Sequence, residues 1–324
     1  MKNVLFFSPP FFNYPAVIHA GLQKKFDVVS YFNSVPSSRL YKMSWYLDTF
    51  FSCSFLKSKL TKLLFTSIKN RIIADKIEYD YIFVIKGSCI PHYFYDFLKE
   101  IYPRAIFIQY IWDDICNDPL APTTFKYYDK IFSYNEKDCK KYNLLFRPFF
   151  YMEEYVSNIK ERKYELSCIM SFSEDRINLL RKIFNTCVTN KKKYILIKGS
   201  KILKIFHRSK IGYLKQYISS KGISYAQMMK ILQESTCQID IQHPKQEGLT
   251  TRAFEALASS TKLITTNANI KKYDFYNPQN ILIISRENPV INIEWLNLPY
   301  KPIENDILRK YTLSSFIVEL FSND

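Results

Sequence analysis

The sequence predicts an α/β protein with two halves, each built around a mostly parallel sheet. Short apolar runs alternate with longer segments in which apolar residues recur with helical period, and most runs end in a polar or proline-containing turn. The alternation stops after Phe146, where Pro148 and a strongly charged stretch interrupt it, and restarts beyond Lys163. At roughly 150 residues per domain, 324 residues also indicate two domains.

In the first half we expect strands at 4–7, 27–31, 81–85, 105–109 and 130–133. Three of these strands end in the turns Ser8-Pro9-Pro10, Lys86-Gly87-Ser88 and Trp112-Asp113-Asp114. Ligands of open α/β sheets lie beyond the carboxyl ends of the strands, so these turns should face one crevice. The basic amphipathic segment 55–77 is expected as a helix that either packs on its own sheet or rests on an anionic membrane.

In the second half the expected strands are 166–170, 194–197, 237–242, 263–266 and 281–284. Helices are expected from Asp175, near 225–234 and from Thr250. Apolar residues with helical spacing predict one amphipathic helix over 303–321.

Composition excludes some classes of protein and leaves others open. With 46 Lys and Arg against 30 Asp and Glu, the net charge of +16 attracts nucleic acid, nucleotide phosphates or an acidic membrane. Seven cysteines without a C-x-x-C pair and four histidines without H-E-x-x-H argue against a disulfide framework or a zinc site. No apolar run approaches the ~18 residues of a membrane span, so we expect a cytoplasmic protein.

The segment 239–258 carries the most chemical information. A buried strand runs into a turn that contains Gly248, and a helix then opens at Thr250 and Thr251, two good capping residues. The unpaired amides and the positive end of the dipole at this helix start form an anion site, to which Arg252 adds charge. The alternative for Arg252 is an ordinary surface ion pair.

Two carboxylates stand at either end of this helix start. Glu247 lies in the turn and Glu255 about one and a half turns into the helix. A ligand whose phosphates rest on the helix start would meet one carboxylate at each end. Carboxylates accept hydrogen bonds from paired hydroxyls, so the spacing fits a sugar nucleotide. Otherwise Glu255 is a solvated helix residue and Glu247 a plain turn residue.

Glu247 and Glu255 form an E-x7-E motif. With Lys262-Leu263-Ile264-Thr265-Thr266-Asn267 and Tyr273-Asp274-Phe275-Tyr276, the segment resembles the carboxyl-terminal domain of GT-B glycosyltransferases, in particular bacterial lipopolysaccharide and capsule enzymes related to CgeB-like proteins. The resemblance covers 166–284 best. It implies two Rossmann-like domains with a cleft between them: an acceptor domain at 1–150, a nucleotide-sugar domain at 151–302, and a helix at 303–324 that crosses back to the first domain.

The resemblance also implies an activity. A sugar would pass from a nucleotide-sugar donor, UDP- or GDP-linked in preference to CMP-linked, to a glycan or lipid-linked glycan of the bacterial surface. The reaction would retain configuration and need neither metal nor cofactor. We expect it in the cytoplasm, with the inner face of the cytoplasmic membrane as the alternative. Glu247 would contact the donor sugar, the amides of Gly248, Leu249, Thr250 and Thr251 would hold the diphosphate, and Glu255 would bind the ribose.

Three further residues are candidates. Arg176 is either a diphosphate or acceptor ligand or a surface charge of its helix, and Gly199 either lines the nucleotide pocket or serves a turn. Asp113 would orient or deprotonate an acceptor hydroxyl, with a helix cap or a buried hydrogen bond as its alternative.

Two other functions compete with the transferase. A dinucleotide enzyme is disfavoured because six glycines are present and none forms G-x-G-x-x-G. A nucleic-acid-binding protein rests on the +16 charge alone, without a recognisable binding motif, so no specific nucleic acid is expected.

Overall fold

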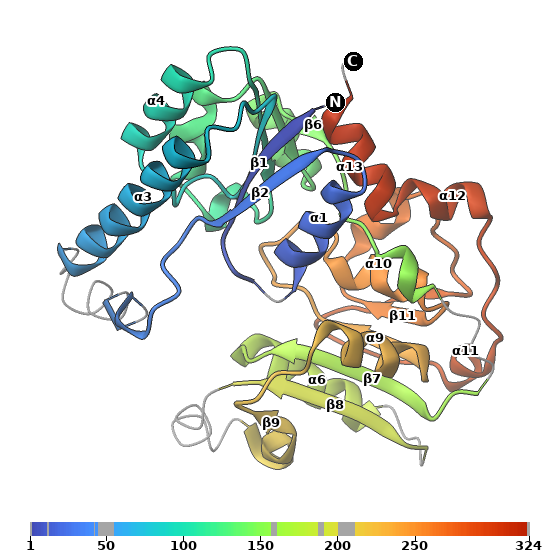
Figure 1. Ribbon diagram of the computed structural model, residues 1–324. Helices are drawn as coiled ribbons and strands as arrows, with labels where there is room; N and C mark the ends of the chain where they lie inside the picture. The colour runs from blue at the N-terminus through green and yellow to red at the C-terminus, as the bar shows by residue number, and fades with distance from the viewer. Residues whose placement is uncertain are drawn as a thin grey trace. The chain divides into compact units, whose positions relative to one another are not determined.

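The computed structural model describes residues 2–11, 13–41, 43–44, 55–156, 161–186, 191–199 and 211–322. The chain divides into two compact units, Met1–Arg147 with Leu320–Asp324, and Pro148–Glu319. Each unit contains a six-stranded sheet in which all neighbouring strands run parallel (Figure 1). The predicted α/β class with two Rossmann-like sheets is therefore confirmed.

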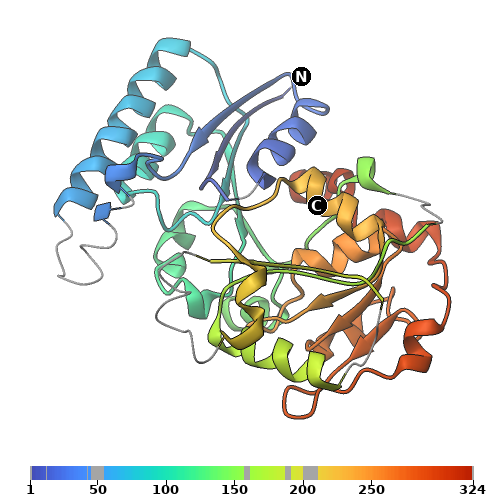
Figure 2. The same ribbon diagram turned by 90° about the horizontal axis from the view of Figure 1, so that it is seen from below.

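The first unit has the sheet order β2-β1-β3-β4-β5-β6. Helices α3 and α4 lie side by side on one face of this sheet, and α1 lies on the other (Figures 1 and 2). Its elements are β1 (Asn3–Ser8), α1 (Tyr14–Gln23), β2 (Val28–Asn33), α3 (Phe55–Asp75), β3 (Tyr81–Ile85), α4 (His92–Ile101), β4 (Ile106–Ile111), η1 (Ile115–Asn117), η2 (Ala121–Tyr127), β5 (Lys130–Ser133), α5 (Glu136–Tyr142) and β6 (Leu145–Phe146).

The core of the first unit explains its local structure. All five residues of β3 are buried, as expected for a central parallel strand covered on both faces. Helix α3 buries Phe65, Ile68 and Ile72, which share one face at helical spacing, and the Phe65 ring lies 4.8 Å from that of Phe94 in α4. The second half of α3 therefore packs on its own sheet.

The second unit has the sheet order β12-β11-β10-β7-β8-β9. Figure 2 shows α6 on one face of this sheet and α9 and α10 on the other. Its elements are η3 (Glu153–Tyr155), β7 (Tyr164–Ser171), α6 (Glu174–Thr186), β8 (Lys193–Lys198), η4 (Gly212–Tyr217), β9 (Ile218–Ser219), α9 (Tyr225–Gln233), β10 (Ser235–Asp240), α10 (Thr251–Ala258), β11 (Lys262–Thr265), η5 (Ala268–Lys272), β12 (Ile281–Ile283), α11 (Ile293–Asn297), α12 (Asn305–Lys310) and α13 (Leu313–Phe321).

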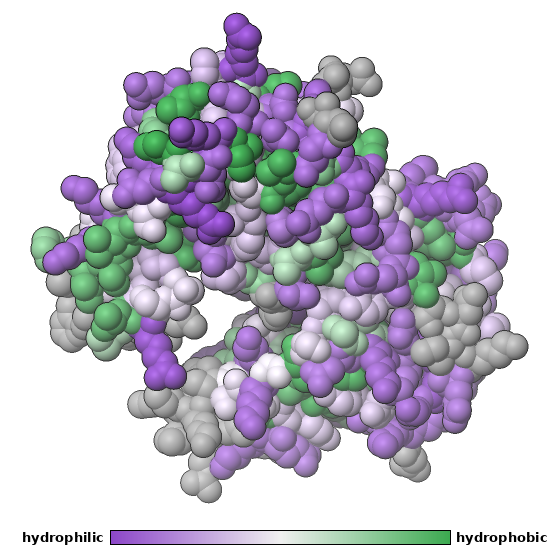
Figure 3. Space-filling model, viewed as in Figure 1, coloured by the Kyte–Doolittle hydropathy of each residue, from purple (hydrophilic) through white to green (hydrophobic). Residues whose placement is uncertain are grey.

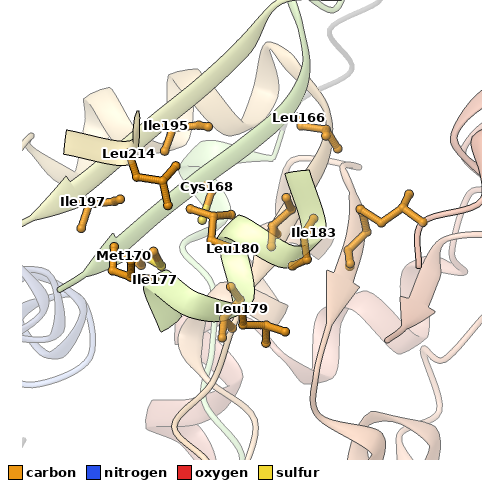
Figure 4. Close-up of a cluster of buried hydrophobic side chains, with 14 of the residues drawn as sticks. Leu166, Cys168, Met170, Ile177, Leu179, Leu180, Ile183, Ile195, Ile197 and Leu214 are labelled. Atoms are coloured by element: carbon orange, nitrogen blue, oxygen red, sulfur yellow. The ribbon is translucent and has the colours of Figure 1, made fainter. Parts of the chain in front are cut away.

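The main apolar core of the second unit lies between its sheet and α6. Cys168 and Met170 of β7 face Ile177 and Leu180 of α6, together with aliphatic side chains of β8 (Figure 4). Alternate residues of each strand point to this core. The opposite sheet face is more polar and carries buried Ser167, along with other polar residues of β10 and β11.

The single helix predicted over 303–321 is wrong in detail, because the structure forms α12 and α13 with a break at Thr312. The break has a visible cause. Tyr151 donates its amide to the Tyr311 carbonyl over 2.8 Å and accepts from the Leu313 amide over 2.9 Å, which holds the chain extended at this point. Thr312 then accepts the Ser315 amide at its hydroxyl and starts the second helix.

The C-terminal end of α13 belongs to the first unit. The ring of Phe321 lies 4.8 Å from Phe26, 5.1 Å from Tyr81 and 5.5 Å from Phe83, measured between centroids. These aromatic contacts fasten the last turn of the helix to the first sheet.

Candidate functional site

The second sheet has a topological switch point between β7 and β10. These neighbours occupy the middle of the sheet, and the strands that follow each of them lie on opposite sides. Doubly wound sheets bind ligands beyond the carboxyl ends of the strands at such a point. The chain leaving β7 carries Arg176, and the chain leaving β10 carries the segment 247–252, so the predicted donor residues meet here.

Two arginines cross over at the switch point. Arg176 of α6 donates from Nε to the carbonyl of Ile241, beyond β10, over 2.8 Å. Arg252 of α10 donates from Nε to the carbonyl of Ile169 in β7 over 3.1 Å. Arg176, which follows β7, is thus held by the chain just after β10. Arg252, which follows β10, is held by β7. Among the described residues the bond to Ile241 is the hydrogen bond of Arg176, and it orients the guanidinium through Nε.

Asp240, the last residue of β10, is the counter-ion of this pair, and sequence reasoning missed it. Its side chain is only 4% exposed. One carboxylate oxygen accepts the Thr250 hydroxyl over 2.9 Å, and the other lies 3.5 Å from Nη1 of Arg252. Thr250 stands at the predicted helix start, but its hydroxyl binds Asp240 instead of capping α10. Ser235, Thr236 and Gln238 of the same strand are polar too, so the local sequence does not single out this acid.

The electrostatics of Arg176 favour an anion at this edge. Burial lowers the pKa of Arg176, and the positive charge of Arg252 lowers it further, whereas Asp240 raises it. A cation that is disfavoured by burial and by a like charge gains from the approach of a phosphate.

The loop between β10 and α10 is fixed through its backbone. The carbonyl of Glu247 accepts hydrogen bonds from the side-chain amides of Asn267 and Asn269, each over 3.1 Å. Asn267 also donates to the carbonyl of Gly248 over 3.2 Å. Glu247 is half-buried at the end of this fixed loop. Asn267, the last residue of the run 262–267, thus connects the end of β11 to the loop that carries Glu247.

The predicted helix start is mostly buried. Gly248, Leu249 and Thr250 are buried, and Thr251 is half-buried. Glu255 is 1% exposed, so its alternative as a solvated helix residue is wrong.

Two further residues complete this edge. Gly199 follows β8 and donates its amide to the Ser219 carbonyl over 2.9 Å. Arg286, which sequence reasoning missed, donates to the Asp175 carboxylate over 2.7 Å and to the Gln242 carbonyl. It therefore ties the start of α6 to the loop after β10.

In the first unit, the predicted residue Asp113 lies at the end of β4 and forms an ion pair with Lys86 at the end of β3. The backbone of Lys86 and Gly87 is left-handed, with φ of +70° and +36°. A Cβ on Gly87 would lie 2.4 Å from Nε2 of Gln109, so glycine is required there. The Asp113 side chain is 42% exposed, which argues against a buried hydrogen bond. The buried residue is Asp114, which accepts the Tyr134 hydroxyl over 2.6 Å.

An aromatic group stands beside this ion pair. The Trp112 ring lies 4.6 Å from Phe11, 5.2 Å from Tyr14 and 5.9 Å from Tyr110. The end of the first sheet thus offers a half-exposed ion pair next to a rigid apolar wall. Such a combination can hold a polyhydroxylated ligand.

Comparison with known proteins identifies the fold. No family model matches the chain, and no curated protein matches it. Solved structures match it over nearly its whole length. α,α-Trehalose 6-phosphate synthase from Burkholderia multivorans has a TM-score of 0.61 at 10% identity, covering 99% of this chain and 96% of that one. The chain has the GT-B fold.

Two other solved structures share this fold. UDP-GlcNAc 2-epimerase from Methanocaldococcus jannaschii, in complex with UDP-GlcNAc and UDP, has a TM-score of 0.55 at 10% identity, covering 99% of each chain. A glycosyltransferase involved in avilamycin A biosynthesis has a TM-score of 0.55 at 10% identity, covering 99% of this chain and 97% of that one. The GT-B expectation is confirmed, and the E-x7-E subtype stays a prediction.

Among the described residues, no helix combines the length and hydropathy needed to cross a membrane. Across the same residues, no group of three or more His, Cys, Asp and Glu side chains is arranged to hold a metal ion.

Proposed function

We propose that the protein is a glycosyltransferase that moves a sugar from a nucleotide-sugar donor to a glycan or lipid-linked glycan acceptor. The observation that carries this proposal is the crossed pair Arg176 and Arg252 at the switch point of the second sheet. Two oriented cations stand where a doubly wound sheet binds phosphates. Proteins that share the fold include a glycosyltransferase and an enzyme solved with UDP-GlcNAc, which supports the same ligand class here.

On the donor side, the diphosphate would lie between the two guanidinium groups and the amides of 248–251. Guanidinium forks match phosphate oxygens, and their charge would stabilise the negative charge that develops on the leaving diphosphate. Glu247, whose backbone is fixed, would accept hydroxyls of the donor sugar. The E-x7-E resemblance assigns Glu255 to the ribose, places Gly199 at the nucleotide, and supports retention with a UDP- or GDP-linked donor. Residues 151–302 are thus the proposed donor domain.

On the acceptor side, we assign residues 1–150 and place the acceptor hydroxyl near Asp113. The ion pair with Lys86 holds this carboxylate at the strand ends, and the Trp112 ring supplies a surface for the apolar face of a sugar. Orienting the hydroxyl is a catalytic contribution in its own right, because the reaction depends on near-attack geometry. The closing proton transfer would go to the leaving diphosphate in a retaining reaction.

A membrane surface is the proposed location, at the inner face of the cytoplasmic membrane, where a lipid-linked acceptor of surface polysaccharide synthesis would lie. Helix α3 carries five Lys and Arg and no acid between Phe55 and Arg71. In the same stretch Phe55 is 74% and Leu63 58% exposed. Figure 3 shows apolar side chains gathered over the start of α3. Apolar and basic side chains together suit an anionic bilayer.

The membrane contact has its own test. Wild-type protein should sediment with vesicles containing anionic phosphatidylglycerol and not with neutral phosphatidylcholine vesicles. The double variant Lys59→Glu, Lys62→Glu should lose this binding, because both lysines are exposed on α3. Equal sedimentation of wild type and variant would remove the membrane from the proposal and leave the transferase untouched.

The transferase itself is tested by ligand-induced thermal stabilisation. Wild-type protein is heated with UDP, GDP, CMP, NAD or a short oligonucleotide. A ligand at 100 times its dissociation constant should add about 2.7 kcal/mol to the free energy of unfolding. We expect UDP or GDP to stabilise the protein, and Arg176→Gln to abolish the shift. Lys140→Gln, which removes an exposed cation of α5, is the matched control and should keep it.

The outcomes separate the candidate functions. A shift with NAD or with the oligonucleotide alone would contradict the transferase. Once the nucleotide is known, incubation of the corresponding nucleotide-sugars with and without acceptor mixtures, followed by NMR of the anomeric proton, reports both transfer and configuration. A nucleotide-sugar epimerised in the absence of any acceptor would instead indicate an epimerase, an activity that occurs on the same fold.

A further inference from the structure

The buried carboxylate of Asp240 lies where it would repel the phosphates of the proposed donor. Asp240 ends β10 at the switch point, beneath the proposed diphosphate site, and is 3% exposed. Its carboxylate contacts Thr250 and Arg252, both at the start of α10. A negative charge at this position repels a phosphate, so Asp240 must favour binding in another way if the site holds a diphosphate.

The arginine pair supplies the reason. Arg176 and Arg252 are like charges: burial lowers the pKa of Arg176, the charge of Arg252 lowers it further, and Asp240, which lies 3.5 Å from Arg252, raises it. Asp240 also fixes one terminal nitrogen of Arg252 at 3.5 Å, while the Nε of that side chain is held separately by Ile169. The Ile169 carbonyl in β7 and the Asp240 carboxylate in β10 thus orient the Arg252 guanidinium from two sides.

We infer that Asp240 is a positioning residue, which holds Arg252 and the first turn of α10 in the geometry that receives the donor diphosphate. This inference rests on the proposed function. The expected benefit is pre-organisation. Without Asp240, binding would have to order the helix start and bring two like charges together, and we infer that this costs more free energy than the repulsion between Asp240 and the ligand.

The inference makes a prediction whose sign is opposite to that of simple electrostatics. Asp240→Asn removes one negative charge next to an anionic ligand, so charge alone would tighten the binding of UDP or GDP. Loss of positioning should instead weaken it, by about tenfold, the scale typical of groups that orient a ligand-binding side chain. The neutral nucleoside, uridine or guanosine, does not use the arginines and should bind Asp240→Asn as well as wild type.

The experiment is isothermal titration of wild type, Asp240→Asn, Thr250→Val and Asp306→Asn with the nucleoside diphosphate and its nucleoside. Asp306 is 90% exposed and away from the switch point, so its variant controls for loss of one charge of the same kind. Thr250→Val removes one bond to Asp240 without changing charge and should weaken diphosphate binding several-fold. It also keeps the test valid if Asp240→Asn does not fold, which circular dichroism and melting will show.

Each outcome has one meaning. Selective loss of diphosphate affinity in Asp240→Asn and Thr250→Val supports positioning. Unchanged or tighter diphosphate binding in the folded variants, or an equal loss for nucleoside and diphosphate, overturns it while the donor site stands. A wild-type protein that binds CMP but neither UDP nor GDP overturns this inference and leaves the transferase standing, and one that binds none of the three overturns the proposed function as well.

Discussion

Arg162 binds the carboxyl ends of two helices, and its removal should be among the most destabilising single changes in the second unit. One terminal nitrogen donates to the carbonyls of Gln233 and Ser235, the latter over 3.1 Å. The other donates to the carbonyls of Ser259 and Ser260, over 3.3 and 2.9 Å. Gln233 ends α9, and Ser259 and Ser260 directly follow α10, where the helix dipoles are negative, so one cation lies at both helix ends; Ser235 begins β10.

The magnitude follows from these bonds. Counting only the contacts to Gln233, Ser235 and Ser260, at ~1–1.5 kcal/mol each for partly buried bonds to a charged donor, gives about 3–4.5 kcal/mol. Burial lowers the pKa of Arg162, which shows that the side chain has lost water that the carbonyls must replace. For a unit of this size, the loss corresponds to a fall in melting temperature of about 10 °C.

Arg162→Met is the perturbation, since it keeps most of the side-chain volume and removes the donors. Differential scanning calorimetry and urea titration measure the free energy of unfolding. Lys230→Met, which removes an exposed cation from the last turn of α9, is the matched control and should cost no more than ~1 kcal/mol. If the free energy of unfolding of Arg162→Met lies within ~1 kcal/mol of the wild-type value, the hydrogen bonds from Arg162 to these carbonyls do not stabilise the unit as argued.

Three further predictions concern single positions. Gly87→Ala should destabilise the first unit by about 2–4 kcal/mol in urea titration, since its φ is +36° and a Cβ would meet Gln109 at 2.4 Å. Burial lowers the pKa of Lys262 below 10.5. Between the lowered pKa and 10.5 the folded state therefore binds fewer protons than the unfolded state. Stability should therefore rise with pH over that window in the wild type, and Lys262→Met should remove the rise. Burial raises the pKa of Asp274, but hydrogen bonds from Lys310 and Tyr311 outweigh this effect and hold the pKa below 3.8. Its contribution to the free energy of unfolding is present above pH 3.8 and lost as the pH falls through the lowered value, a loss that Asp274→Asn should not show.

The sequence predicted the strands of both sheets well because parallel strands buried on both faces read as continuous apolar runs. The run 81–85 is an example, since all its residues are buried in β3. The two-residue strands Leu145–Phe146 and Ile218–Ser219 were missed, because two residues leave no period to detect. The break at Thr312 was missed because its cause, Tyr151, lies far away in the chain.

The sequence placed Arg176 after the strand β7 and Arg252, with the segment from Glu247, after the strand β10, and the structure brings these turns to one edge of the sheet; their donor-binding role stays a prediction. Their partners were not predicted. Asp240 and Arg286 act through contacts with backbone and side chains of other elements, and nothing in local sequence marks such a contact. The same holds for Lys86, whose pairing with Asp113 depends on β3 and β4 being neighbours.

Helix α10 connects the stability of the second unit with its proposed chemistry. The helix is only 8 residues long, and both of its ends are held by charged side chains. Arg162 fixes the carbonyls at its carboxyl end, while Asp240 fixes Thr250 and Arg252 at the start. A helix this short has little intrinsic stability in water, so its position depends on these tertiary anchors. The amides at its start can bind a phosphate only if the helix is held in one position. Arg162, through the carbonyls of Ser259 and Ser260, therefore supports the same proposed site as the arginine pair.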